Sequence, residues 1–209
     1  MLDLRLYLVT SRQPSGGRNI EWIVEEAVKG GVTVVQLREK NCSTRQFIEL
    51  ALRIKPILAQ HKIPLIINDR LDVALAVDAE GLHIGQSDMP YAMARSLLGN
   101  NKIIGLSIET MDQVREANAM DVDYIGISPV FDTPTKTDTA KAFGLEGIRR
   151  VIALSNHSAV AIGGINKDNA DAVMQAGANG IAVVSAVCSA INPREAALEL
   201  RKSVERHIT

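Results

Sequence analysis

Residues Asp123–Asp138 read DYIGISPVFDTPTKTD, a buried strand followed at once by a polar loop. Tyr124–Ile127 is an uninterrupted apolar run, which is typical of a strand buried on both faces. Pro129 ends that strand because proline has no N–H to donate to a neighbouring strand. Beyond it, Thr133–Thr137 carries three threonines and a lysine around one proline. Such a loop suits a phosphate, although the same residue types also form ordinary solvated turns.

The same strand-then-loop unit recurs along the whole chain. Eight strand-like runs are predicted at Leu4–Val9, Thr33–Leu37, Pro64–Ile67, Leu82–Ile84, Ile103–Leu106, Tyr124–Ile127, Ala159–Ile162 and Ile181–Val184. Amphipathic segments between them predict helices at Ile20–Lys29, Thr44–His61, Leu71–Val77, Tyr91–Leu98, Met111–Ala119, Leu145–Leu154, Lys167–Ala176 and Arg194–His207. Asn19, Ser43 and Asp168 are the predicted N-caps. No linker divides the chain, so residues 1–209 are expected to form one domain.

Alternation of strands and helices fits either an open doubly wound sheet or an eightfold (β/α) barrel. Polar residues follow seven of the eight strands, from Gln36 after the second to Ser185 after the eighth. In an open sheet, strand ends six strands apart would lie about 29 Å from one another. A barrel brings all of them to one mouth, where barrel enzymes place their sites. The sequence therefore predicts an α/β fold of the (β/α)₈ TIM barrel class.

Composition excludes several functional classes. The 209 residues carry a net charge of −1 and only 3% aromatics, which argues against nucleic-acid binding. No apolar run approaches the roughly 20 residues of a membrane span, and Asp3 and Arg5 interrupt the N-terminal run, so it predicts a strand rather than a signal peptide. Cys42 and Cys188 show no metal or disulfide spacing. We expect a cytoplasmic protein with small-molecule ligands.

The polar residues after strands two to four indicate a diphosphate site. Gln36, Arg38 and Lys40 alternate and would share one direction, although charged residues at strand ends often simply face solvent. Asp69 and Asp88 place two carboxylates on neighbouring strand ends. Such oxygens hold Mg²⁺, which usually takes the rest of its shell from waters and substrate phosphates. The competing interpretation is that both aspartates cap helices.

A second anion site is predicted after strands seven and eight. Gly163 and Gly164 follow one strand, and Val184 and Ser185 follow the other. In barrels, these loops and a short helix commonly hold a phosphate, and glycines let backbone N–H groups approach it. His83 and Tyr124 are interpreted as packing or supporting groups, and Glu109 is assigned no role.

The motifs QLREK, NDR, GLHIGQSD, GLS, PVFDTPTKTD, AIGGI and VVSA, in this order, resemble the thiamine phosphate synthase family over essentially the whole chain. The resemblance implies a Mg²⁺-dependent transferase. It would couple 4-amino-2-methylpyrimidin-5-ylmethyl diphosphate with 4-methyl-5-(2-phosphooxyethyl)thiazole, giving thiamine phosphate and diphosphate. No general base is needed for attack by the thiazole nitrogen.

The resemblance also implies roles for individual residues. Matching the pyrimidine-diphosphate contacts are Gln36, Arg38, Lys40, Asn68, Ser107 and Lys136, of which Arg38, Ser107 and Lys136 are the expected catalytic residues. Matching the thiazole-phosphate contacts are Thr133, Thr135, Gly164, Val184 and Ser185. Asp69 and Asp88 match the metal ligands. Ser128 and Glu109 depart from the usual family pattern, in which glycine stands at the first position and His or Thr often stands at the second.

Two other functions stay open at this point. A thiazole tautomerase would use the same barrel and phosphate site but would need neither the paired aspartates nor the cations of the second strand. A non-catalytic regulatory barrel would bind thiazole phosphate without turnover. The sequence also leaves open whether the chain forms a homo-oligomer.

Overall fold

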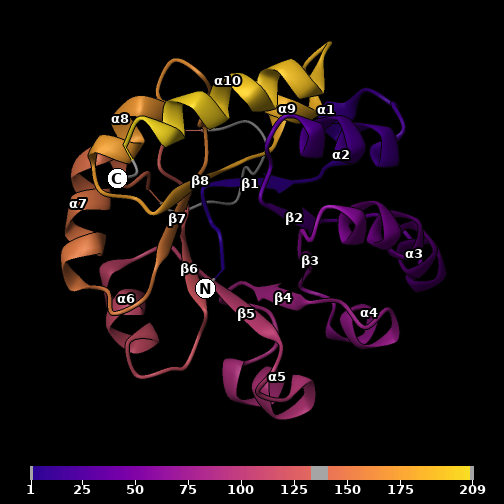
Figure 1. Ribbon diagram of the computed structural model, residues 1–209. Coiled ribbons are helices and arrows are strands. Elements are labelled where there is room, and N and C mark those ends of the chain that lie inside the picture. The colour runs from indigo at the N-terminus through magenta and orange to yellow at the C-terminus, as the bar shows by residue number, and fades with distance from the viewer. Residues whose placement is uncertain (1, 133–140, 208–209) are drawn as a thin grey trace.

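The computed structural model describes residues 2–132 and 141–207, and they contain a closed barrel of eight parallel strands (Figure 1). The strands are β1 Leu6–Val9, β2 Val34–Leu37, β3 Leu65–Asn68, β4 Gly81–Ile84, β5 Ile103–Ile108, β6 Tyr124–Ile127, β7 Ala159–Ile162 and β8 Gly180–Val183. They pair in chain order, and β1 pairs with both β2 and β8, which closes the sheet. The predicted barrel is confirmed and the open sheet is excluded.

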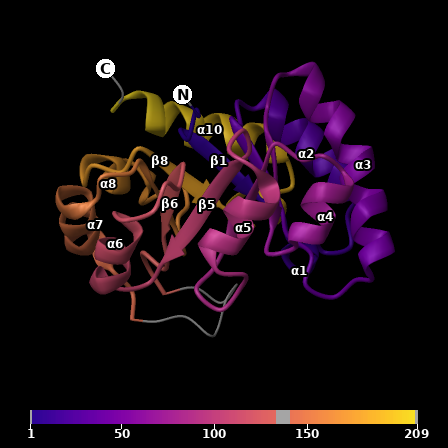
Figure 2. The same ribbon diagram turned by 90° about the horizontal axis from the view of Figure 1, so that it is seen from below.

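Helices surround the strands. They are α1 Arg12–Ser15, α2 Ile20–Lys29, α3 Thr44–Gln60, α4 Leu71–Ala76, α5 Tyr91–Leu98, α6 Met111–Ala117, α7 Gly144–Leu154, α8 Ala170–Gln175, α9 Ser185–Cys188 and α10 Pro193–Glu205. Figure 2 shows α2, α3 and α4 on one side of the strands and α6, α7 and α8 on the other. The short helices α1 and α9 were not predicted, because four residues carry too little apolar periodicity to be recognised.

Local signals explain several of the helix boundaries. The Asn19 side chain accepts a hydrogen bond from the Trp22 N–H, and Ser43 forms a capping box with Gln46, so both predicted N-caps are confirmed. The prediction for Asp168 is wrong, because α8 begins two residues later, after Asn169. Here the Asn166 side chain accepts from the Asp168 N–H, and this local turn delays the helix.

The apolar core has two layers, one between strands and helices and one inside the barrel. The inner layer contains Leu4, Tyr7, Val9, Val34, Ile66, Tyr124, Val160 and Ala182. Tyr7 and Tyr124 are the largest fully buried side chains of the described residues. Their phenol groups bring polar atoms into the barrel interior, below the open mouth. In the part of the chain that the structure describes, no helix has the length and apolarity to span a membrane.

Candidate active site

A cavity of about 330 Å³ opens at the carboxyl ends of the strands. Every predicted site residue among those described lines it, namely Gln36, Arg38, Lys40, Asn68, Asp69, Asp88, Ser107, Gly164, Val184 and Ser185. Thr133, Thr135 and Lys136 lie outside the described residues, so their predicted roles are not tested. Closure of the barrel is what brings these residues from the ends of six strands to one place.

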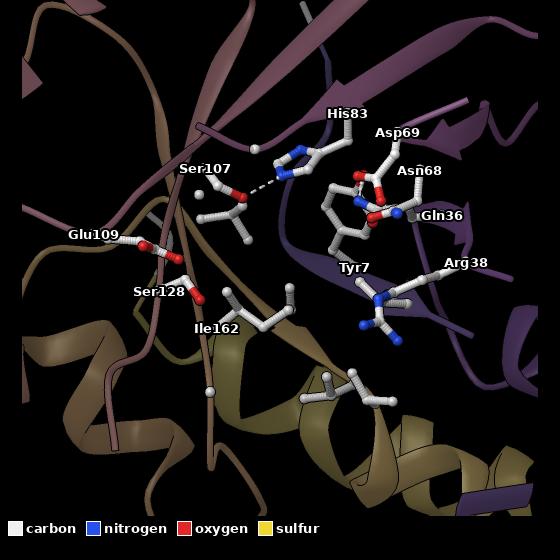
Figure 3. Close-up of a pocket in the computed structure, with 18 of the residues that line it drawn as sticks. Tyr7, Gln36, Arg38, Asn68, Asp69, His83, Ser107, Glu109, Ser128 and Ile162 are labelled. Atoms are coloured by element: carbon white, nitrogen blue, oxygen red, sulfur yellow. Dashed lines mark hydrogen bonds between the residues drawn. The ribbon is translucent and has the colours of Figure 1, made fainter. Parts of the chain in front are cut away.

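Two cations and two carboxylates form one side of the cavity, which we call the charged wall: Arg38, Lys40, Asp69 and Asp88. Arg38 is anchored through its backbone N–H, which donates to Thr10 Oγ1 at 3.1 Å. The Lys40 ammonium group forms an ion pair with Asp69. Figure 3 shows Arg38, Asn68 and Asp69 beside Gln36 at the edge of the cavity. The alternation predicted for β2 therefore delivers Gln36, Arg38 and Lys40 to the same cavity.

The two aspartates contact one another. Burial raises the pKa of Asp88, and the hydrogen bond that it shares with Asp69 raises it further. Burial opposes ionisation of Asp69 as well, but hydrogen bonds from Lys40 and Asp88 hold the pKa of Asp69 below its ordinary value. The pair therefore divides into an ionised Asp69 and an Asp88 that retains a proton more readily, as expected for carboxylates in contact.

The competing interpretation of these aspartates as helix caps is wrong. Arg70 stands at the N-cap position of α4 and Pro90 at that of α5, and neither helix has a side-chain cap. Asp88 Oδ2 instead accepts from the Gly85 N–H at 2.7 Å. Asp69 has a φ of 59°, a left-handed conformation that is uncommon for a residue with a side chain. A strained backbone at a carboxylate in a cavity points to a functional position.

The arrangement fits a divalent cation that takes part of its shell from a ligand. Two carboxylates close enough to share a hydrogen bond present several oxygens to one point, and a cation there would replace the proton between them. Residues 2–132 and 141–207 contain no group of three or more His, Cys, Asp or Glu side chains placed to hold a metal ion. One or two carboxylates are the usual protein contribution to Mg²⁺ that is bound together with phosphates.

The opposite side of the cavity, which we call the glycine wall, consists of Gly163, Gly164, Val184 and Ser185. The two glycines have φ values of 105° and 67°, which L side chains rarely adopt. A Cβ on Gly164 would lie 2.9 Å from both the Asp132 carbonyl oxygen and the Phe131 Cβ. Glycine is therefore required here by the neighbouring loop after β6, whatever ligand the wall binds.

A buried chain of polar side chains underlies the cavity. Gln36 Nε2 donates to the Tyr7 hydroxyl at 2.9 Å, and the Tyr7 and Tyr124 hydroxyls lie 2.6 Å apart. His83 Nδ1 is 3.0 Å from the Tyr124 hydroxyl, and His83 Nε2 is 2.9 Å from Ser107 Oγ (Figure 3). We call these five residues the cross-barrel network. Sequence reasoning interpreted His83 and Tyr124 only as packing or supporting groups, and it missed Tyr7 altogether.

Ser128 and Glu109, which depart from the pattern of the resembling family, also line the cavity. Figure 3 shows both on the side where Ser107 lies. Glu109 is held through its backbone N–H, which donates to Gln113 Oε1 at 2.7 Å. Both residues are therefore placed where they can influence how a ligand sits.

The family model and the relatives that share 39% to 54% identity with this chain agree on one family. The family model described as thiamine monophosphate synthase matches residues 6–187. The thiamine-phosphate synthase of Albidiferax ferrireducens is 54% identical over 97% of this chain and 92% of that protein. That of Vibrio parahaemolyticus is 53% identical over 92% of this chain and 94% of that protein. The structure of a thiamine phosphate pyrophosphorylase from Pyrococcus furiosus superimposes with a TM-score of 0.91 at 39% identity, over 100% of this chain and 98% of that one.

Proposed function

The chain belongs to the thiamine monophosphate synthase family, and from this premise we propose that its cavity catalyses the synthesis of thiamine phosphate. It is a transferase that joins the pyrimidine methyl diphosphate to the thiazole phosphate and releases diphosphate. The observation that carries this proposal is the opposition of two unlike walls across one cavity. The charged wall suits a metal diphosphate, and the glycine wall suits a second, smaller phosphate.

The reaction needs a leaving group to be stabilised more than it needs a base. The bond between the methylene carbon and the bridging oxygen of the diphosphate breaks, and the oxygen keeps the electron pair. The amino group of the pyrimidine donates electrons to the methylene carbon, which carries developing positive charge. The thiazole nitrogen then forms the new C–N bond with its own lone pair. Because no proton has to be removed in either step, the cavity requires no general base.

Arg38 and Lys40 line the cavity, and they are the described cations that we propose to hold the departing diphosphate. Their charges are most valuable when negative charge grows on the bridging oxygen, so they favour the transition state over the bound substrate. Gln36, Asn68 and Ser107 offer neutral hydrogen-bonding groups to the pyrimidine. Lys136, outside the described residues, is predicted to add a further cation, and Thr133 and Thr135 to contact the thiazole phosphate.

We propose Mg²⁺ as the cofactor, held by Asp69 and Asp88. Bound there with diphosphate, it would neutralise the negative charge of the leaving group. Lys40, already paired with Asp69, would sit beside both the cation and the diphosphate. The protein residues would then order the site: Gly85 fixes Asp88 through its N–H, and Lys40 fixes Asp69.

On the opposite wall, Gly164, Val184 and Ser185 are the residues proposed to hold the thiazole phosphate. Gly164 and Ser185 both line the cavity, and Ser185 is exposed. A monophosphate held there would direct the thiazole ring across the cavity toward the charged wall. The thiazole phosphate and the diphosphate would thus bind to different walls, and the thiazole ring and the pyrimidine would lie between them.

The tautomerase and the non-catalytic barrel are both less consistent with the charged wall. Neither function requires two carboxylates in contact beside two cations. Neither function explains why Asp88 lies close enough to Asp69 for its pKa to be raised, or why Asp69 adopts a left-handed backbone.

We further propose the cytoplasm as the compartment of the enzyme. Cys42 and Cys188 are both free thiols, and Cys188 is buried. The proposed ligands are small phosphorylated metabolites, which are handled inside the cell. No nucleic-acid or membrane partner is proposed.

The deciding experiment incubates the purified chain with both substrates and Mg²⁺ and detects thiamine phosphate by chromatography. Diphosphate should appear in equal amount, and excess EDTA should abolish both products. Product formation that persists in EDTA would contradict the metal assignment. Conversion of a thiazole carboxylate tautomer without coupling would instead identify a tautomerase, and thiazole-phosphate binding without any product would identify a regulatory barrel.

A further inference from the structure

The cross-barrel network has a direction, because the Gln36 side-chain nitrogen, with which it begins, can only donate. The Gln36 side-chain nitrogen carries hydrogens and no lone pair for a hydrogen bond, so the Tyr7 oxygen is the acceptor of that bond. A phenol has one hydrogen, and because Tyr7 is buried that hydrogen needs an acceptor. The Tyr124 oxygen, 2.6 Å away, can accept it. The Tyr124 hydrogen is directed in turn to His83 Nδ1. Each bond fixes the sense of the next.

The chain of hydrogen bonds ends at Ser107, which lines the cavity. If His83 Nδ1 accepts, the neutral imidazole carries its hydrogen on Nε2, and that hydrogen points to Ser107 Oγ. Ser107 therefore accepts from inside the barrel and has its own hydrogen left for a ligand. At the other end, the Gln36 nitrogen is committed to Tyr7, so the carbonyl oxygen is the end of the amide that Gln36 offers.

We propose that Tyr7, Tyr124 and His83 are positioning residues that fix Gln36 as an acceptor and Ser107 as a donor toward the bound pyrimidine. Their proposed effect on the substrate passes through these two residues. An aminopyrimidine matches this polarity, because its amino group donates and its ring nitrogens accept. This inference rests on the proposed function for the identity of the ligand, but the direction of the network is a property of the protein alone.

The interior of the barrel is shaped around this network. A Cβ on Gly105 of β5 would lie 2.1 Å from Tyr124 Cζ and 2.6 Å from His83 Nδ1. A Cβ on Gly126 of β6 would reach within 3.4 Å of the His83 ring. Glycine weakens a strand interior and often marks a close approach by another group. At Gly105, therefore, β5 has no room for a side chain because His83 and Tyr124 fill the space, whereas at Gly126 a Cβ would make only an ordinary contact with His83.

The phenol groups are suited to act as fixed donors. Tyr7 and Tyr124 are fully buried, and burial raises the pKa of each above its ordinary value, so both keep their hydrogens at physiological pH. Phenylalanine would fill the same space without any polar atom to satisfy. The hydroxyls therefore have no packing role that phenylalanine could not perform, and their order along the network accounts for their presence.

The first test measures the tautomer of His83 by nitrogen NMR of histidine-labelled, ligand-free protein. We expect a neutral ring with its hydrogen on Nε2. Tyr124→Phe should remove the bond to Nδ1 and shift that nitrogen resonance, whereas Tyr91→Phe should leave it unchanged. Tyr91 is the matched control because its hydroxyl also donates a hydrogen bond, to the Asp121 carbonyl, but does not line the cavity.

A hydrogen found on Nδ1, or on both nitrogens, would overturn the proposal. So would an unchanged Nδ1 resonance in Tyr124→Phe. Because this measurement needs neither substrate nor turnover, it decides the direction of the network even if the proposed reaction fails.

The second test compares the dissociation constants of the aminopyrimidine and of an analogue in which an oxo group replaces the amino group. The unmodified protein should prefer the amino compound, because the Gln36 oxygen faces its donor. Tyr7→Phe frees the amide to turn, so this preference should fall about tenfold, the factor that one neutral hydrogen bond contributes. Tyr91→Phe should keep the original preference.

An unchanged preference in Tyr7→Phe would overturn the positioning role. A merely structural role for Tyr7 would weaken both compounds equally and leave their ratio intact, so the ratio separates the two explanations. Failure of the amino compound to bind the unmodified protein would count against the proposed function and against this ligand assignment together.

Discussion

The charged wall and the glycine wall face one another across the same cavity but are built in different ways. The charged wall presents side-chain atoms on four residues whose backbones come from β2, β3 and β4 and the loops after them. The glycine wall presents mainly backbone, with two glycines at positive φ held against Phe131 and Asp132. The first wall can therefore lose its chemistry without losing its fold, and the second cannot. Substitutions on the two sides should separate activity from stability.

The largest expected effect is Asp69→Asn on the charged wall. Asparagine has the same shape and tolerates the left-handed backbone, but it lacks the charge proposed to hold Mg²⁺. We expect kcat to fall about 10²–10³-fold, in line with losing one strong electrostatic contact in the transition state. Steady-state kinetics with saturating Mg²⁺ measures it.

Asp78→Asn is the matched control for that prediction. Asp78 also has positive φ and pairs with a lysine, Lys102, but it does not line the cavity. Its kcat should stay within about twofold of the unmodified enzyme, as expected for a surface substitution. Equal loss in both variants would show that the effect is structural.

Gly164→Ala on the glycine wall should act on stability first. The added Cβ would meet the Asp132 carbonyl and the Phe131 side chain at 2.9 Å. Gly16→Ala serves as the control, since Gly16 has a similar φ of 61° and no atom within 4 Å of an added Cβ. Urea unfolding should show the Gly164 variant less stable than the Gly16 variant by about 1–3 kcal/mol, the usual cost of overpacking.

Equal stability of these two alanine variants would mean that the loop after β6 moves aside at little cost. The glycine wall would then resemble the charged wall in tolerating substitution, and the contrast between them would fail.

Lys40→Met should weaken binding of the pyrimidine diphosphate about tenfold, because it removes one charge-assisted contact. The side chain is 52% exposed, so its ion pair with Asp69 contributes under about 1 kcal/mol to folding. Calorimetry measures the affinity, and unfolding should be nearly unchanged. In Lys29→Met, which breaks a comparable surface pair with Glu25 and Glu26, the affinity should not change.

Ser185→Ala is the smallest predicted effect. Backbone groups are proposed to carry most of the phosphate binding on the glycine wall, so losing one hydroxyl should raise the KM for thiazole phosphate about threefold to tenfold. The KM for the pyrimidine diphosphate should not move. Ser189→Ala, at the other end of α9 and outside the cavity, provides the control. A loss above 10²-fold would show that side chains dominate this wall too.

The sequence was a good guide to most local features, although the N-cap predicted at Asp168 was wrong. The apolar runs predicted every strand to within two residues at each end. A strand buried on both faces is a nearly continuous apolar run, so its ends are marked by a change to polar residues. Asn19 and Ser43 capped their helices as predicted, since a cap depends on residues three positions away. The mouth residues followed from strand ends once the barrel was inferred.

Long-range relations were beyond the sequence. Tyr7 looks like one more apolar residue in a strand, and nothing nearby indicates that its hydroxyl meets Tyr124, which lies 117 positions later in the chain. The sequence likewise placed Asp69 and Asp88 only at the ends of neighbouring strands. The structure shows that β3 pairs with β4 and that the two carboxyl groups share a hydrogen bond. The requirement for glycine at 164 came from a loop on a neighbouring strand, so the interpretation based on phosphate binding alone was incomplete.

The cross-barrel network also bears on how the barrel assembles. Its members come from β1, β2, β4, β5 and β6, so a fragment that stops after β4 would contain Tyr7 and His83 but not Tyr124 or Ser107. Such a half-barrel would either bury hydroxyl and imidazole groups without partners, at about 1–3 kcal/mol each, or stay open to water. Partly closed intermediates are thereby disfavoured against the complete ring. Polar groups that serve a ligand in the finished protein thus also make closure of the last strands more nearly all-or-none.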